Sequence, residues 1–197
     1  STDADLMRVI HSKPVLVRHI DNNRSDNPWK VRLVSQFNMT SDSDKFLDHE
    51  EIEPRIATRE KALAKLDDGT HVFPLYEGKM FWHFDHRYGT YKGQSPKQAN
   101  KGVLPRVDDY LHDDPNYRIQ PKFWVQADHT RAALGDNHGR DWFFSWRDVG
   151  PSERTLVGCI CPITAAGNVA PVLAADVPAV QAAALAAVMS SLVCDYS

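Results

Sequence analysis

The chain has 197 residues, 42% of them hydrophobic and 10% aromatic, so it is long and apolar enough to bury a core of its own. Its formal net charge of −3 excludes a uniformly basic surface. The cysteine count is odd, and the spacing of Cys159 and Cys161 favours small core residues on a strand over a disulfide framework or a zinc site. The one long apolar run, residues 177–194, is interrupted by polar residues, so we expect a soluble, cytoplasmic protein.

From the N-terminus, the predicted elements are two strands and two short helices. Residues 14–20 and 29–33 have the pattern of strands, and the Asx- and Pro-rich loop 21–28 between them allows the two to pair. A capping-box pattern predicts a helix start at Ser41, and a second helix is expected over residues 58–66.

The middle of the chain becomes extended and then rich in loops. Residues 72–84 are aromatic and extended, whereas residues 89–121 are rich in Gly, Pro, Asn and Asp and predict long loops. A further strand begins at Phe123, and Asp128 is placed to cap a short helix that ends near Gly135.

The last third contains the clearest hairpin. Alternation over residues 142–146 and an apolar run over 155–160 predict two strands joined by a turn at 150–153. Because the second strand is apolar on both faces, we expect it to be central in its sheet. A short strand near 169–173 then precedes a helix with an apolar stripe over 185–193.

Short strands and a few helices without regular βαβ alternation predict an α+β fold, with a mixed, mainly antiparallel sheet, several short helices and long loops. We expect one compact domain, in which residues 1–70 form a lead-in of strands and short helices and residues 71–197 form the core. Because the sequence opens without an initiator methionine, we expect it to be a fragment of a larger protein.

Charge is segregated along the chain. Residues 76–106 carry six basic and two acidic side chains, a net charge of +4, whereas residues 41–54 carry six acidic and one basic, a net charge of −5. Such runs are most often solvated faces, so charge alone supports nucleic-acid binding only modestly.

Several enzyme signatures are absent from the sequence. It contains no Gly-x-Gly turn and no Pro-Pro dipeptide, so neither the cofactor turn nor the base-binding loop of an amino-methyltransferase is present, and phosphate-binding loop motifs are missing as well. A metal-dependent hydrolase or nuclease stays open as an alternative, because the chain holds metal-ligand types near one another, although ordinary surface pairs explain them more simply. These residues are His83, Asp85 and His86 for a hydrolase, and Glu51, Glu53, Lys61 and Lys65 for a nuclease. We assign no catalytic residue, no metal ligand and no cofactor-binding residue.

Residues 74–80 and 84–87 closely resemble the Leu-Tyr-Glu-Gly-Lys-Met…Phe-Asp-His-Arg signature of large adenine-specific DNA methyltransferases of restriction-modification and related phage-defence systems. Residues 27–29 and 37–40 resemble the same family's lead-in, and 147–149, 153–156 and 192–196 resemble its downstream stretches. The residues that carry the match are Tyr76, Glu77, Gly78, Phe84, Asp85, His86, Arg147, Asp148, Arg154 and Thr155.

In that family this region follows the catalytic domain, so the resemblance implies a target-recognition module that binds double-stranded DNA. It further implies a methyltransferase domain in the same parent chain as partner, with S-adenosylmethionine bound there and no cofactor in this fragment. A protein-docking module of the same complex stays open as another alternative.

Reading a duplex requires basic groups for phosphates and polar groups for base edges. The candidates are Lys79, Arg87, Lys92, Gln94, Lys97, Gln98, Asn100 and Lys101. We expect the loop over 88–105 to enter a groove and residues 76–87 to be its scaffold, with Trp82, Tyr88 and Tyr91 as anchors rather than stacking platforms. An internal ion pair between Asp85 and Arg87 is the competing interpretation for those two residues.

Overall fold

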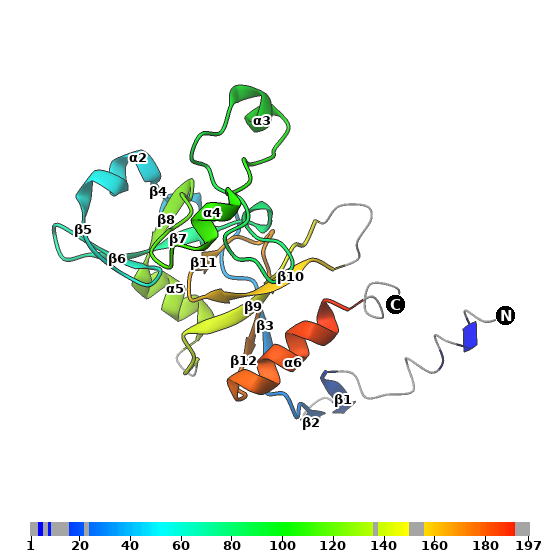
Figure 1. The fold of residues 1–197 in the computed structure, drawn as a ribbon. Helices are drawn as coiled ribbons and strands as arrows, with labels where there is room; N and C mark the ends of the chain where they lie inside the picture. The colour runs from blue at the N-terminus through cyan, green and yellow to red at the C-terminus, as the bar shows by residue number, and fades with distance from the viewer. Residues whose placement is uncertain are drawn as a thin grey trace.

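The structure is a computed structural model that describes residues 16–21, 24–135, 138–149 and 156–191, together with Ala4, Asp5 and Arg8. Its architecture is α+β, with two main sheets, short helices and long connections, as predicted (Figure 1). None of the helices in these ranges has the length and apolar character needed to cross a bilayer.

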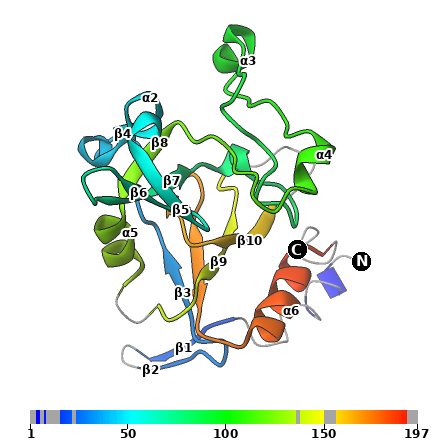
Figure 2. The same cartoon turned by 60° about the vertical axis from the view of Figure 1, so that its left-hand side comes forward.

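The first sheet has four antiparallel strands, and α6 (Ala179–Met189) lies beside it (Figure 2). Leu185 of this helix is buried in one cluster with Phe144 and Leu173 of the sheet, and such burial of apolar side chains is the main force that holds the layer together. In spatial order the strands are β10 (Gly158–Pro162), β9 (Trp142–Trp146), β12 (Val172–Ala175) and β3 (Val31–Val34).

The second sheet has an antiparallel path of five strands, and α5 (Ala127–Leu134) packs against it. Trp124 and Val72 are fully buried between its strands and the short helices at its edge. In spatial order the strands are β4 (Leu47–Asp48), β8 (Phe123–Gln126), β7 (His71–Tyr76), β6 (Leu63–Leu66) and β5 (Ile56–Glu60).

A two-residue strand, β11 (Ala165–Ala166), joins the two sheets. It lies between β10 and β12 in the chain but pairs in parallel with β7, so the predicted mixed sheet is confirmed. The core at this junction contains Tyr76, Phe81 and the two cysteines of β10. The junction fixes the end of β7, where the family-like motif begins.

The remaining elements are short. They are β1 (Arg18–Asp21), β2 (Arg24–Asp26), α2 (His49–Ile52), α3 (Pro96–Asn100) and α4 (Asp109–His112), with 3₁₀ turns η1 (Ser43–Lys45), η2 (Glu53–Arg55) and η3 (Gly78–Met80).

The predicted helix over 58–66 is wrong, because these residues form the β5–β6 hairpin. Ala64 and Leu66 are buried while Lys65 between them is exposed, which is the period of a strand. Lys61 adopts a left-handed backbone (φ 54°) and makes the turn. The helix start predicted at Ser41 is also wrong, since the chain there makes the 3₁₀ turn η1 with Asp42 before it.

The predicted pairing of the first two strands is wrong as well. Strand β1 pairs with β2, inside the expected loop, and β3 pairs with β12 from the other end of the chain. Asn27 explains the separation, because its side chain exchanges two hydrogen bonds with the main chain of Val31 and turns the backbone into β3. Residues 14 and 15 of the predicted strand lie outside the described ranges.

The elements predicted near the C-terminus are largely confirmed. Strand β8 leads into α5, which is followed by Gly135 with a positive φ of 83°, and β9 pairs with β10 over five residues. The cap predicted at Asp128 is wrong, because the N-cap is Gln126 and Asp128 lies in the first turn of the helix. The predicted turn at 150–153 and the end of the apolar stripe beyond residue 191 lie outside the described ranges. Val188, expected in that stripe, is exposed.

The expectation that the second hairpin strand is central is wrong, because β10 lies at an edge of its sheet. Both faces of β10 are nevertheless covered. Cys159 and Cys161 pack against Phe81 and Met80 on one face, and Ile160 packs against the α6 cluster on the other. A strand that is apolar on both faces therefore requires two covering layers and not two neighbouring strands.

Candidate nucleic-acid interface

Residues 89–106 form an arm that projects from the body and carries α3 near its tip (Figures 1 and 2). Its base is closed by an antiparallel bridge between Gly89 and Arg106. The backbone N–H of Thr90 donates to the carbonyl of Pro105 (3.1 Å), and that of Val107 donates to Tyr88 (2.8 Å). The predicted long loop is therefore a structured element with a fixed base.

The tip of the arm is held by its own polar side chains. Ser95 Oγ accepts from the backbone N–H of Gln98, and Gln98 Oε1 accepts from that of Ser95, which is a capping box at the start of α3. Gln94 Nε2 donates to the carbonyl of Val103 (2.8 Å). Two of the three amides proposed as base readers thus fold the arm, whereas Asn100 is exposed at the end of α3.

The arm is also cationic. Its sequence from Gly89 to Arg106 contains four basic residues and no acidic one. Lys92, Lys97 and Lys101 are exposed, and none of them makes an ion pair within the described part of the chain. Arg106 is exposed as well and lies 5.4 Å from the ring centroid of Tyr88, with its nearest carboxylate, Asp109, 3.9 Å away.

Lys79 contacts Glu77 of the motif and Tyr91 at the start of the arm. Its Nζ lies 3.2 Å from a carboxylate oxygen of Glu77 and 5.0 Å from the ring centroid of Tyr91. The Tyr91 hydroxyl donates to the other oxygen of Glu77, and burial together with this bond raises the pKa of Tyr91. These three residues lock the first turn of the motif to the start of the arm.

Two glycines allow this region to pack closely. A Cβ on Gly78 would lie 2.7 Å from the carbonyl oxygen of Val169, and one on Gly89 would lie 2.5 Å from that of Lys79. Real Cβ contacts are not this short, so both positions require glycine for close approach of main chains. Gly78, a motif residue, is thereby explained by packing.

Arg147 contacts the residues that lie just before the arm in the chain. Its Nε and Nη2 donate to the carbonyl of Phe81 (3.0 and 2.6 Å), and its guanidinium lies 4.6 Å from the centroid of Trp82. Trp82 in turn stacks on Tyr88 with centroids 5.4 Å apart. Burial lowers the pKa of Arg147. Trp82 and Tyr88 therefore act as anchors between the motif and the base of the arm.

The Phe84–Asp85–His86–Arg87 segment begins in a tight turn. Trp82 and Asp85 form an antiparallel bridge across this turn. Phe84 stands at the turn with a left-handed backbone (φ 59°) and a side chain that is 70% exposed. Arg87 donates to the carbonyls of His112 and Asp114, each at 2.8 Å, and Asp85 faces His112 Nε2 at 3.2 Å. The internal ion pair suggested for Asp85 and Arg87 is not formed, because each has a partner in the loop around α4.

Three of the residues considered for a metal centre pair with residues outside that set, among them Asp85, which faces His112. Glu53 pairs with Arg59, and Lys61 pairs with Asp141. Across the described ranges no three His, Cys, Asp or Glu side chains gather where they could hold a metal ion. Of the remaining motif residues, Asp148 is exposed, and its backbone N–H donates to the carbonyl of Val169 (3.2 Å). Arg154 and Thr155 lie outside the described ranges.

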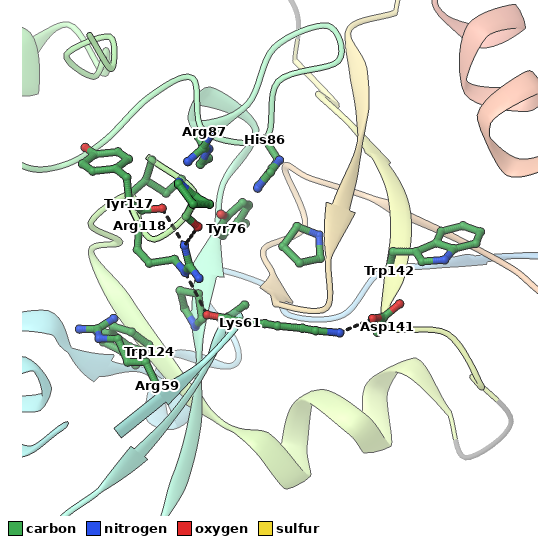
Figure 3. Close-up of a pocket in the computed structure, with 15 residues that line it drawn as sticks. Arg59, Lys61, Tyr76, His86, Arg87, Tyr117, Arg118, Trp124, Asp141 and Trp142 are labelled. Atoms are coloured by element: carbon green, nitrogen blue, oxygen red, sulfur yellow. Dashed lines mark hydrogen bonds and ion pairs between the residues drawn. The ribbon is translucent and has the colours of Figure 1, made fainter. Parts of the chain in front are cut away.

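A cavity of about 440 Å³ lies at the foot of the arm (Figure 3). His86 and Arg87, immediately before the arm, form part of its wall, and burial followed by the charge of Arg87 lowers the pKa of His86. The other lining residues are Arg59, Lys61, Ala62, Pro74, Tyr76, Pro115, Tyr117, Arg118, Ile119, Trp124, Asp141, Trp142 and Pro162. Sequence reasoning missed this cavity, because its walls come from separate segments and share no local motif.

Comparison with known proteins gives no further guide, since no protein-family model, no curated protein and no solved structure matches the chain.

Proposed function

We propose that this chain is the DNA sequence-recognition domain of an adenine-specific DNA methyltransferase of a restriction-modification or related phage-defence system. It holds duplex DNA for methylation by a catalytic domain of the parent protein, and S-adenosylmethionine binds to that domain. The resemblance of residues 74–87 to the methyltransferase signature motivates the proposal, and the observation that carries it is the cationic arm that this motif supports.

The arm has the properties that phosphate binding requires. Four basic side chains lie on one projection that contains no carboxylate, so a polyanion that approaches it meets no repulsive group there. Ion pairs with phosphates release counterions, which gives such an arm a steep dependence on salt concentration. Lys92, Lys97 and Lys101 are therefore the main candidates for DNA contacts.

Base contacts need side chains that are not already engaged. Asn100 is exposed at the end of α3 and has the amide that pairs with adenine, while lysines are suited to guanine. Gln94 and Gln98 contribute instead by holding the arm in shape. Lys79 and Arg87 contribute through the scaffold, since both already have partners within the fold.

The test is fluorescence anisotropy of the chain with labelled duplex DNA. The variant Lys92→Ala/Lys97→Ala/Lys101→Ala should lose DNA affinity by about tenfold or more and should reduce the salt slope by up to about 2.7, which is about 0.9 for each phosphate that the variant no longer neutralises. A matched control, Lys30→Ala/Lys65→Ala/Lys122→Ala, removes the same charge from exposed positions outside the arm and should change both quantities less. If both triple variants bind alike, the arm does not bind the DNA. Binding that survives high salt in all three proteins would favour a protein-docking role instead.

A further inference from the structure

The cavity at the foot of the arm is large enough for a small molecule and is built from distant parts of the fold (Figure 3). One side comes from the β5–β6 hairpin and β7, another from residues 115–119, and a third from residues 141–142 at the start of β9. Its volume of about 440 Å³ falls in the range of sites that bind single small ligands.

Two arginines give the cavity an uncompensated positive charge. Arg118 donates from Nε to the carbonyl of Lys61 and from Nη1 to those of Pro115 and Tyr117, and its Nη2 has no partner among the described residues. Arg87 uses one N–H of each Nη atom on a carbonyl. Hydrogen bonds to carbonyls fix both guanidinium groups without neutralising their charge. Each guanidinium keeps N–H groups that can donate hydrogen bonds to an anion.

The acidic content of the cavity is small. Asp141 is the one carboxylate among the lining residues, and its oxygen lies 2.6 Å from Nζ of Lys61. This ion pair is exposed and joins two sides of the cavity. Exposed ion pairs contribute little free energy, so the carboxylate and the lysine are held together weakly. Arg59, the fourth basic lining residue, pairs with Glu53 outside the cavity, so the wall as a whole favours an anionic ligand.

The rest of the wall is apolar and aromatic. It includes Pro74, Ile119, Trp124 and Pro162, together with Tyr76, which is only 6% exposed. The Tyr76 hydroxyl makes no hydrogen bond to any described residue, although a buried tyrosine hydroxyl normally has a partner. The cavity therefore offers a flat ligand an apolar surface and one polar contact deep inside.

We propose that this cavity binds one nucleotide unit, with the phosphate on Arg87 and Arg118 and the base against the wall that contains Tyr76. A fork of guanidinium N–H groups matches the geometry of phosphate oxygens, and a base combines a flat apolar face with polar edges. The nucleotide comes either from free mononucleotide or from a DNA strand in which one nucleotide has left the stack. Only the second source rests on the function proposed above.

The first experiment is calorimetry of the chain with dAMP, dTMP, adenosine and inorganic phosphate. Both mononucleotides should bind more tightly than adenosine or phosphate, because each of these offers only one of the two groups that the cavity recognises. Arg118→Gln should weaken dAMP binding by about tenfold, the effect of removing one charge-assisted hydrogen bond. Asp141→Asn should strengthen it, since the substitution removes the lining carboxylate and releases Lys61.

Arg118→Gln and Asp141→Asn are expected to change dAMP affinity in opposite directions. Damage to the fold would instead weaken dAMP binding in both variants. Arg131→Gln, an exposed arginine on α5 outside the cavity, is the matched control and should leave dAMP binding unchanged. If dAMP binds but neither cavity variant changes its affinity, the assignment is wrong.

A second experiment distinguishes the two sources. Anisotropy compares a fully paired duplex with the same duplex carrying one unpaired adenosine. If the chain prefers the duplex with the unpaired adenosine, and Arg118→Gln abolishes that preference, the nucleotide comes from a DNA strand, even if dAMP does not bind. If dAMP binds and the chain shows no such preference, the nucleotide is a free mononucleotide. Absence of both overturns the proposal. The arm variant should leave dAMP binding unchanged, so failure of the cavity and failure of the DNA-binding arm give different results.

Discussion

The motif scaffold, residues 76–87, and the arm, residues 89–106, are adjacent in sequence and both contain basic residues, yet they use them differently. In the scaffold, Lys79 contacts Glu77 and Tyr91, and Arg87 donates to main-chain carbonyls of the α4 loop. In the arm, the three lysines are exposed and make no ion pair within the described residues. The basic residues of the scaffold are therefore fixed by partners within the fold, although Arg87 keeps N–H groups that face the cavity, whereas the lysines of the arm have no such partners among the described residues.

The largest effect on stability should come from the close packing of the arm's first residue, Gly89, against the scaffold. Gly89→Ala places a Cβ 2.5 Å from the carbonyl oxygen of Lys79, so the free energy of unfolding should fall by about 1–3 kcal/mol. Gly139→Ala is the control, because a Cβ there meets nothing within 4 Å. Urea denaturation of both variants measures the difference, and equal stability would show that the main chains at the arm's base do not pack this closely.

A smaller loss should follow from the polar lock between scaffold and arm. Tyr91→Phe removes the donor to Glu77 and should cost about 1 kcal/mol, since Glu77 keeps its ion pair with Lys79. Tyr117→Phe, at a hydroxyl for which no hydrogen bond is found within the described chain, should cost less. Chemical denaturation at neutral pH measures both, and a reversed order would place the lock elsewhere.

Acid should weaken the fold through its partly buried histidines, one of which, His86, lies in the scaffold. Burial lowers the pKa of His86 below its ordinary value of 6.5, and His49 and His138 are shifted in the same direction for the same reason. The unfolded chain therefore binds more protons, and stability should fall as the pH drops below 6.5 until it reaches the lowered pKa values. His86→Gln should reduce this pH dependence in denaturation experiments. His129→Gln, at an exposed position on α5, should leave it unchanged.

The smallest effect on stability should come from the arm's lysines. Lys92→Ala/Lys97→Ala/Lys101→Ala removes exposed side chains without ion pairs, so thermal denaturation should shift little, by about 0.5 kcal/mol or less for each substitution. A large loss of stability would mean that the arm's charges support the fold, and the contrast between the two regions would then fail.

The sequence predicts the fold class and the elements whose local signals agree. Strand β9 is a short aromatic run with a high strand propensity, and α5 is followed by Gly135, whose positive φ ends it. The hairpin over 56–66 has the opposite character, because Thr58 is a plausible helix cap, while the buried Ala64 and Leu66 are only two apolar positions in a short strand.

Loop composition and charge predict the arm's location within one residue at each end. They do not predict the roles of its amides, because the partners of Gln94 and Gln98 are set by a backbone conformation that composition does not encode. The cavity is out of reach of sequence reasoning altogether. Lys61 and Asp141 are 80 residues apart, and only the folded sheets bring them to 2.6 Å.

The most direct test of the central claim is photocrosslinking with the arm's charges left intact. p-Benzoylphenylalanine placed at Asn100, at the end of α3, should crosslink to duplex DNA, whereas the same group at Asp128 on α5, in the body, should not. Crosslinks at residue 128 with none at residue 100 would contradict the account, and so would equal crosslinking at both positions.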